Sequence, residues 1–412
     1  MKKVLLGTLA VLTLAACSKD EVVQQNPNDA ITFSVVTNKA VSRAANGYCN
    51  KSLPDNFQVW ANVPDGSGFK PYFSGDQYDQ DGSTNNYLNN GESRYWPYSD
   101  INFFACKNAT PDWNADHTTL VVTNFQVKDD VDKQVDFIYA VQNVTGKPST
   151  GQTTINFRHA LSQIEFQARN ENTKLYVEIS GVSVCKVKNQ GTFTFPTSST
   201  NAQIGEHNKP AGAENPDYAL DSKVTGSWDP ATLSGNKTYT ITTNKDDETD
   251  TQVKVIKGNS TNVSLTVTDP SSQEHNKNTM YLLPQTLTAW VPSATAPKPA
   301  AQDGAYFLVK CKIFNVADPA TGYQSSDVRI WPKADDTYAD VAIPFSATWV
   351  GGKRYVYTFV FTDKGNGGYN PEPGGTNPED VLVPIKLVVT VDDFVDAGNT
   401  DVKMEKPTPV VP

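Results

Sequence analysis

The side chains that could perform acid–base or metal chemistry are few and widely separated. The 412-residue chain has four histidines (His117, His159, His207 and His275), and no two lie three or four residues apart. A zinc hydrolase usually needs paired ligands, such as those of an HExxH helix, and the chain has no such motif. It also contains no Gly-x-Ser-x-Gly elbow and no phosphate-binding P-loop. We therefore predict no catalytic residue, and interpret His159 as structural.

Two acidic segments are the best candidates for binding a cation. One contains Asp76, Asp79 and Asp81, and the other is Asp246-Asp247-Glu248 with Asp250. Carboxylate oxygens are suitable ligands for Ca²⁺, but neither segment has the twelve-residue spacing of an EF-hand loop. No Cys-x-x-Cys pair is present either. The sequence therefore predicts solvated carboxylates, no metal and no cofactor.

One cysteine lies where its thiol could be chemically modified. Lys2 and Lys3 precede an apolar stretch over residues 4–14, and Leu14-Ala15-Ala16-Cys17 closes it. A mature transmembrane helix needs roughly 20 apolar residues, so this stretch is too short to remain in a bilayer. The pattern resembles a lipoprotein signal. It predicts a signal peptide over residues 1–16, a lipid on Cys17 that anchors the chain to a membrane, and a flexible tether over residues 17–29.

Net charge and chain length limit the possible partners and the number of domains. A net charge of −10 argues against nucleic acid or an anionic lipid surface as a partner. The chain is longer than one hydrophobic core usually serves, which predicts two domains. A polar break at residues 145–152 places them at residues 30–150 and 151–395, followed by a polar, proline-rich tail at residues 396–412.

Alternating apolar and polar residues dominate the chain. The clearest examples are residues 30–35, 355–361 and 385–391, where every second side chain is apolar. Such alternation places one face of a strand in a core and the other in solvent. Turn residues separate these segments at short intervals, which is typical of β-sandwiches. We predict an all-β fold, with residues 129–141 as the best candidate for a short helix.

Four further cysteines could form disulfides in an exported protein. Cys106, Cys185 and Cys311 lie in segments that look like strand interiors, and Cys49 follows a polar stretch. Free Cys behaves as a small, buried hydrophobe. We therefore expect free, buried thiols rather than disulfides.

Five ordered segments are similar to signature elements of the Bacteroidetes-type fimbrillins, the subunits of type V pili. They span nearly the whole predicted mature chain. The segments are Tyr95-Trp96-Pro97 with Ile101-Asn102-Phe103-Phe104-Ala105, Asp136-Phe137-Ile138-Tyr139-Ala140, Ile155-Asn156-Phe157-Arg158-His159-Ala160-Leu161-Ser162-Gln163-Ile164-Glu165-Phe166, Leu282-Leu283-Pro284-Gln285, and Trp349-Val350-Gly351-Gly352-Lys353-Arg354-Tyr355-Val356-Tyr357.

This resemblance implies two tandem transthyretin-like β-sandwich domains on a lipid-anchored precursor at the outer membrane. It also implies a structural role as a stalk or tip subunit of a fimbria that supports adhesion, with no enzymatic activity. Assembly would begin when a protease cuts after Arg43, or alternatively after Lys39. The first strand, residues 30–36, would then leave and a strand of another subunit, identical or sibling, would replace it. Ala30, Ile31, Phe33 and Val35 belong to that strand, and the last three alternate as strand addition requires.

The tail departs from what a strand donor needs. It contains Pro407 and Pro409, and proline cannot donate a hydrogen bond to a strand ladder. Either the donor lies upstream, around residues 385–391, or the chain does not donate a strand.

The alternative function is a non-polymerising surface adhesin that binds a glycan or another receptor on a host or bacterial cell. Trp113 and Trp228 lie in polar surroundings and are the candidate sugar contacts. The other five tryptophans adjoin apolar strand residues, so we assign them to the core.

Overall fold

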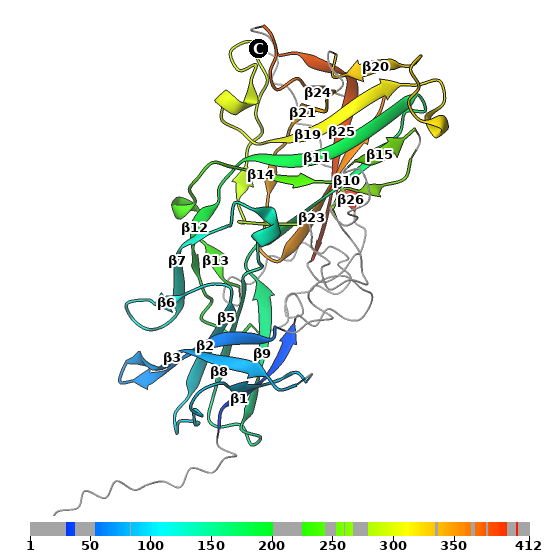
Figure 1. The fold of residues 1–412 in the computed structure, drawn as a ribbon. Coiled ribbons are helices and arrows are strands. Elements are labelled where there is room, and N and C mark those ends of the chain that lie inside the picture. Colours follow the sequence, from blue (N-terminus) through cyan, green and yellow to red (C-terminus); the bar gives the residue numbers. More distant parts are fainter. Residues whose placement is uncertain are drawn as a thin grey trace, which may run out of the picture.

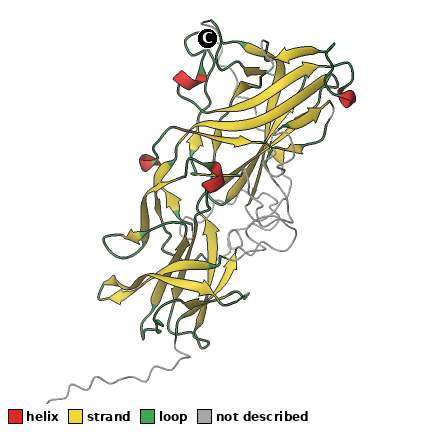
Figure 2. Ribbon diagram, viewed as in Figure 1, coloured by secondary structure: helices red, strands yellow, loops and turns green. Residues whose placement is uncertain are grey.

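The structure, a computed structural model, describes residues 30–37, 54–82, 84–200, 225–243, 253–258, 260–266, 279–333, 337–363, 367–375, 378–393 and 401–402. Within these ranges nearly all regular structure is β-strand (Figure 2), so the prediction of an all-β fold is confirmed. The helices described are single 3₁₀ turns, η2 (Val131–Lys133), η3 (Pro230–Thr232), η4 (Pro299–Ala301) and η5 (Pro319–Thr321). In the described ranges, none is long and apolar enough to span a bilayer.

The first part of the chain closes into a barrel, in the order β1-β4-β3-β2-β5-β8-β9 (Figure 1). Its neighbouring strands run antiparallel, except that β1 lies parallel to β9. The opening strand of the described chain therefore also completes the barrel. The strands are β1 (Thr32–Thr37), β2 (Asn56–Asp65), β3 (Gly68–Gln80), β4 (Asn86–Asn89), β5 (Ile101–Lys107), β8 (Ile138–Val144) and β9 (Gln152–His159).

A larger sheet occupies the other end of the molecule (Figure 1), in the order β14-β11-β19-β21-β24-β25-β23-β10-β16. Four short strands, β15, β17, β20 and β26, pair beside it. The strands are β10 (Ser162–Asn170), β11 (Leu175–Val187), β14 (Lys237–Thr242), β15 (Lys254–Lys257), β16 (Val263–Ser264), β17 (Met280–Leu282), β19 (Tyr306–Asn315), β20 (Val328–Trp331), β21 (Ala339–Pro344), β23 (Lys353–Phe361), β24 (Gly367–Tyr369), β25 (Asp380–Asp393) and β26 (Asp401–Val402).

Two small sheets complete the fold. The first has the order β13-β12-β7-β6 and lies between the barrel and the large sheet (Figure 1). The second pairs β18 with β22. Their strands are β6 (Asp112–Trp113), β7 (Leu120–Gln126), β12 (Gln190–Thr194), β13 (Ser227–Trp228), β18 (Thr286–Leu287) and β22 (Ala347–Thr348).

The barrel and the large sheet share one topological feature. β1 pairs in parallel with β9, and β10 pairs in parallel with β23. Only Ala160 and Leu161 separate β9 from β10. The predicted domain boundary near residue 150 falls between β8 and β9, which are neighbours in the barrel, and the division into two domains stays a prediction.

The predicted helix at residues 129–141 is wrong. The Asp130 side chain accepts a hydrogen bond from the Asp132 N–H and caps the single turn η2. The chain then becomes extended, and Ile138–Val144 pairs with β5 along its whole length. Aromatic and β-branched residues dominate that strand, and they favour an extended backbone.

Strand β5 separates two hydrophobic clusters. Phe103 points into the barrel interior with Phe33 and Phe57, whereas Phe104 belongs to a larger cluster outside the barrel. That larger cluster continues through the four-stranded sheet, for example Phe193, and into the large sheet. The barrel wall is therefore packed on both faces.

The three cysteines in the described ranges, Cys106, Cys185 and Cys311, are buried free thiols, as predicted. Burial raises the pKa of Cys106 to about 12 and that of Cys185 to about 11. Cys17 and Cys49 lie outside the described residues.

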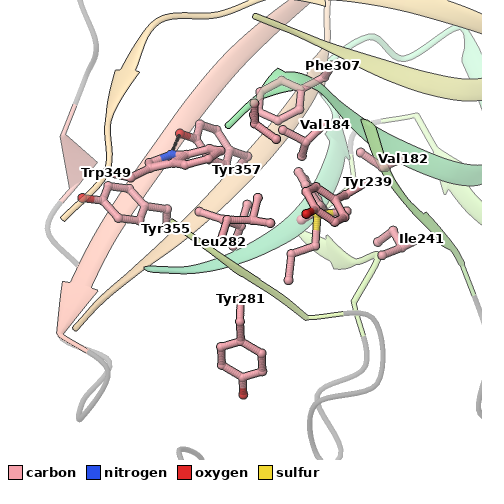
Figure 3. Close-up of a cluster of buried hydrophobic side chains, with 14 of the residues drawn as sticks. Val182, Val184, Tyr239, Ile241, Tyr281, Leu282, Phe307, Trp349, Tyr355 and Tyr357 are labelled. Atoms are coloured by element: carbon pink, nitrogen blue, oxygen red, sulfur yellow. Dashed lines mark hydrogen bonds between the residues drawn. The ribbon is translucent and has the colours of Figure 1, made fainter. Parts of the chain in front are cut away.

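The core of the large sheet contains a buried polar pair (Figure 3). The Trp349 indole N–H donates to the Tyr357 hydroxyl at 2.8 Å, and both side chains are almost completely buried. Desolvation raises the pKa of the Tyr357 hydroxyl, which keeps this buried group neutral.

Replacing Tyr357 with phenylalanine keeps the ring but leaves the Trp349 N–H buried without this acceptor. We expect Tyr357→Phe to lower the free energy of unfolding by about 1–3 kcal/mol, measured by denaturant titration. Tyr323→Phe, at a side chain that is exposed, is the matched control and should change stability by less than about 0.5 kcal/mol. Equal effects of the two variants would contradict the role of the buried pair.

Candidate functional site

The opening strand β1, together with Ile31 just before it, presents one apolar face to the barrel interior. Ile31, Phe33 and Val35 are 1%, 0% and 1% exposed, whereas Thr32 and Ser34 on the other face are half-buried. Alternation along an extended strand produces this division. The structure therefore places the three predicted apolar residues of the first strand together in one core.

Phe33 occupies the centre of that core. Its ring makes edge contacts with Tyr78 of β3, Phe103 of β5 and Phe57 of β2, at centroid separations of 4.7, 5.1 and 6.1 Å. Such aromatic pairs stabilise a core beyond the area that they bury. Without β1, these rings would line an apolar groove open to water.

The backbone of β1 is paired on both sides. Six residues, from Thr32 to Thr37, pair with β9 in parallel register. On the other side, Phe33 and Ser34 pair with Tyr87 and Asn86 of β4. Removing β1 would leave two strand edges with unpaired N–H and C=O groups, which is the arrangement that binds an added strand.

Three of the segments that resemble fimbrillin signatures meet where β9 joins β10. The His159 Nδ1 atom pairs with the Asp136 carboxylate, and both side chains are largely buried. The Ser162 hydroxyl donates to the Val350 carbonyl at 2.9 Å. The His159–Asp136 pair therefore braces the end of β9 within the barrel, and the Ser162–Val350 bond braces the start of β10 within the large sheet, on either side of the two-residue link.

Two further bonds continue this junction. The backbone N–H of Trp349 donates to the Gln285 carbonyl at 2.9 Å, and the backbone N–H of Val350 donates to the Tyr355 hydroxyl at 2.8 Å. Gly351 lies so close to the link that a Cβ atom there would stand 2.9 Å from the Ala160 carbonyl oxygen. The glycine in this segment is therefore required by the close approach of two backbones.

The two candidate glycan contacts lie apart and pack against other aromatic rings. The Trp113 ring meets Phe104 edge-on at 5.5 Å and its indole N–H donates to Ser74 Oγ. The Trp228 indole N–H donates to the Ala160 carbonyl at 2.7 Å, and its ring meets Phe193 at 5.2 Å. The role of Trp113 and Trp228 in glycan binding stays a prediction.

The remaining tryptophans lie in or against the core. Trp60, Trp290, Trp331 and Trp349 are buried, and Trp96 packs against the barrel cluster.

The other predicted sites fall mostly outside the described residues, which exclude Cys17, Lys39, Arg43 and the acidic segment at 246–250. Of the first acidic segment, Asp76 pairs with Arg94 and Asp79 accepts a hydrogen bond from Gln77. Over the described ranges, no group of three or more His, Cys, Asp or Glu side chains could hold a metal ion.

Sequence reasoning missed the contacts at the start of β1. Arg94 and Gly151 accept hydrogen bonds from the Ile31 and Thr32 N–H groups, and Trp96 donates to Gly151. The Tyr95-Trp96-Pro97 motif marks this region, but nothing in the sequence pairs it with Gly151.

Phe33→Ala should lower the free energy of unfolding of the full chain by about 3–5 kcal/mol, because the cavity would lie among three aromatic rings. Ser34→Ala, on the opposite face of β1, is the control and should shift it by less than about 0.5 kcal/mol. Denaturant unfolding followed by tryptophan fluorescence measures both. A Phe33→Ala loss no larger than that of the control would mean that β1 does not belong to the core.

Comparison with known proteins assigns the chain to a family. A family model described as fimbrillin-like matches residues 42–290, more than half of the chain. No match was found among the curated proteins.

Solved structures are similar to this chain only at low sequence identity and low TM-score. A fimbrial protein from Bacteroides vulgatus aligns at 13% identity and a TM-score of 0.48, over 89% of this chain and 99% of its own. A candidate cell adhesion protein from Parabacteroides distasonis aligns at 11% identity and a TM-score of 0.43, over 90% of this chain and 99% of its own. The assignment rests on the family match alone: the chain belongs to the fimbrillin-like family.

Proposed function

We propose that this protein is a structural subunit, stalk or tip, of a cell-surface fimbria that supports adhesion, and that it acts through binding rather than catalysis. It is exported as a lipoprotein, anchored in the outer membrane through Cys17, and cut after Arg43, with Lys39 as the alternative site. β1 then leaves the barrel and a strand of another subunit takes its place. Its partners are the processing protease, identical or sibling subunits, and a surface receptor.

The observation that carries this proposal is the position of β1. It is the first strand described, lies between two strands that do not pair with each other, and fills the barrel with Ile31, Phe33 and Val35. The candidate cleavage sites follow its last residue, Thr37, within a few positions. A cut there would separate β1 from the remainder of the barrel without dividing the barrel's other strands.

The free energy of burying apolar side chains favours replacement of β1 by another strand over loss of β1 alone. Burying one large apolar side chain contributes roughly 1.5–3 kcal/mol, so three contribute roughly 5–9 kcal/mol. This is comparable to the entire stability of a typical domain, about 5–15 kcal/mol. An empty groove would therefore be costly, and β1 should leave as another strand enters. A strand of similar pattern would restore most of the lost free energy.

The upstream donor candidate is already engaged within its own sheet. β25 pairs with β23 from Asp393↔Lys353 to Ile385↔Phe361, and Ile385 and Val389 are buried. Donating residues 385–391 would break this ladder. This favours a subunit that receives a strand and keeps β25 in place.

Processing can be tested on the protein recovered from the cell surface. For the wild type we expect a mature, fimbria-associated form whose N-terminal residue is Ala44, identified by terminal sequencing and intact mass. Arg43→Ala should abolish that form and leave the chain attached through Cys17, while Lys39→Ala should be processed normally. Assembled fimbriae in which the wild-type chain retains lipidated Cys17 would rule the proposal out.

A further inference from the structure

We propose that a small group of residues around the start of β1 forms a latch that sets how readily β1 leaves its groove. The latch comprises Asp76, Arg94, Tyr95, Trp96 and Gly151. The inference rests on the proposed exchange of β1 and assigns positioning residues for it.

The latch holds the N-terminal end of β1 through the backbone. The Ile31 N–H donates to the Arg94 carbonyl at 2.7 Å, and Ala30 forms an antiparallel bridge with Tyr95. The Thr32 N–H donates to the Gly151 carbonyl at 3.3 Å. The first residues of β1 are thus bound on one side by the Arg94–Tyr95 backbone and on the other by the residue that precedes β9.

Two side chains brace these backbone groups. The Arg94 guanidinium makes two hydrogen bonds with the Asp76 carboxylate, at 2.5 and 3.2 Å, and lies over the Phe73 ring at 5.6 Å. The Trp96 indole N–H donates to the Gly151 carbonyl at 2.9 Å, and its ring meets Phe103 edge-on. The Gly151 carbonyl therefore accepts from both Trp96 and β1, so Trp96 fixes the acceptor that holds Thr32.

Within the described ranges, the opposite end of β1 has strand partners on one side only. The Val35 N–H still donates to the Asn85 carbonyl at 2.9 Å, but among the described residues Val36 and Thr37 pair with β9 alone. The candidate cleavage sites, Lys39 and Arg43, follow this end. Opening should therefore begin at Thr37, proceed toward Ile31 and meet the latch last.

The test is hydrogen–deuterium exchange on the intact, uncleaved full chain, resolved to single β1 amides by fragmentation mass spectrometry. In the wild type, the Val36 and Thr37 amides should exchange faster than those of Ile31 and Thr32. Trp96→Phe keeps an aromatic ring against Phe103 but removes the N–H donor. Because one hydrogen bond contributes a factor of about five to an equilibrium, the Ile31 and Thr32 amides should exchange about fivefold faster.

Trp113→Phe is the matched control, since it removes an indole N–H that donates to Ser74 Oγ, away from β1. It should leave β1 exchange unchanged. Asp76→Asn, which weakens the brace on Arg94, provides a second variant should Trp96→Phe fail to fold. A purely structural role would accelerate all barrel amides together and lower the global unfolding free energy in parallel, whereas the latch predicts an effect confined to the start of β1.

Unchanged exchange at Ile31 and Thr32 in the latch variants, or a wild type in which Thr37 is better protected than Ile31, would overturn the inference. Because no cleavage is involved, this outcome is distinguishable from failure of the proposed function. That function fails if assembled protein keeps its lipid, whatever the exchange rates of β1.

Discussion

Backbone pairing at the closing position of the barrel is the constraint on which the rest of the structure depends. β4 and β9 do not pair with each other, and β1 supplies partners to both. The same strand fills the centre of the barrel with Phe33. Leaving a buried strand edge unpaired and an apolar interior open to water both cost free energy, so a strand has to occupy this position. Backbone pairing alone does not determine whether that strand comes from this chain or from another.

The barrel wall opposite β1 is also held by contacts that do not involve β1. Strand β5 packs Phe103 inward and Phe104 outward, so the wall opposite β1 is tied to the core outside the barrel. A chain of side-chain amides crosses the same wall: Asn143 donates to Asn102 and Asn102 donates to Asn62, each at 2.8 Å. At the link to β10, the His159–Asp136 pair braces the end of β9 and the Ser162–Val350 bond braces the start of β10. These contacts hold the wall opposite β1 without involving β1 itself.

Much of this could be predicted from local sequence, because period-two alternation is a local signal. It located β1, β23 and β25, and it identified Ile31, Phe33 and Val35 as one face. The same reasoning failed at residues 129–141, where a single capped turn precedes a strand that includes Tyr139 and Val141.

Pairing between distant segments could not be predicted from the sequence, because alternation does not indicate which strands are neighbours. No local pattern in the sequence indicates the parallel register of β1 with β9, which lies more than 100 residues away. The bond from Trp96 to Gly151 was equally hidden, although the motif around Trp96 was recognised. The start of β1 therefore emerged as a site only from the structure.

The central claim is that β1 must leave the barrel for the protein to assemble. It is tested most directly by linking β1 covalently to its neighbour in the barrel. Ser34 and Thr154 are register partners on β1 and β9, and both side chains lie away from the barrel core. Adjacent strands are close enough for a disulfide, so Ser34→Cys with Thr154→Cys should lock β1 in place. The account predicts that the oxidised double variant folds but is absent from fimbriae, that reduction restores its incorporation, and that either single variant assembles normally. Incorporation of the oxidised double variant at the wild-type level would contradict it.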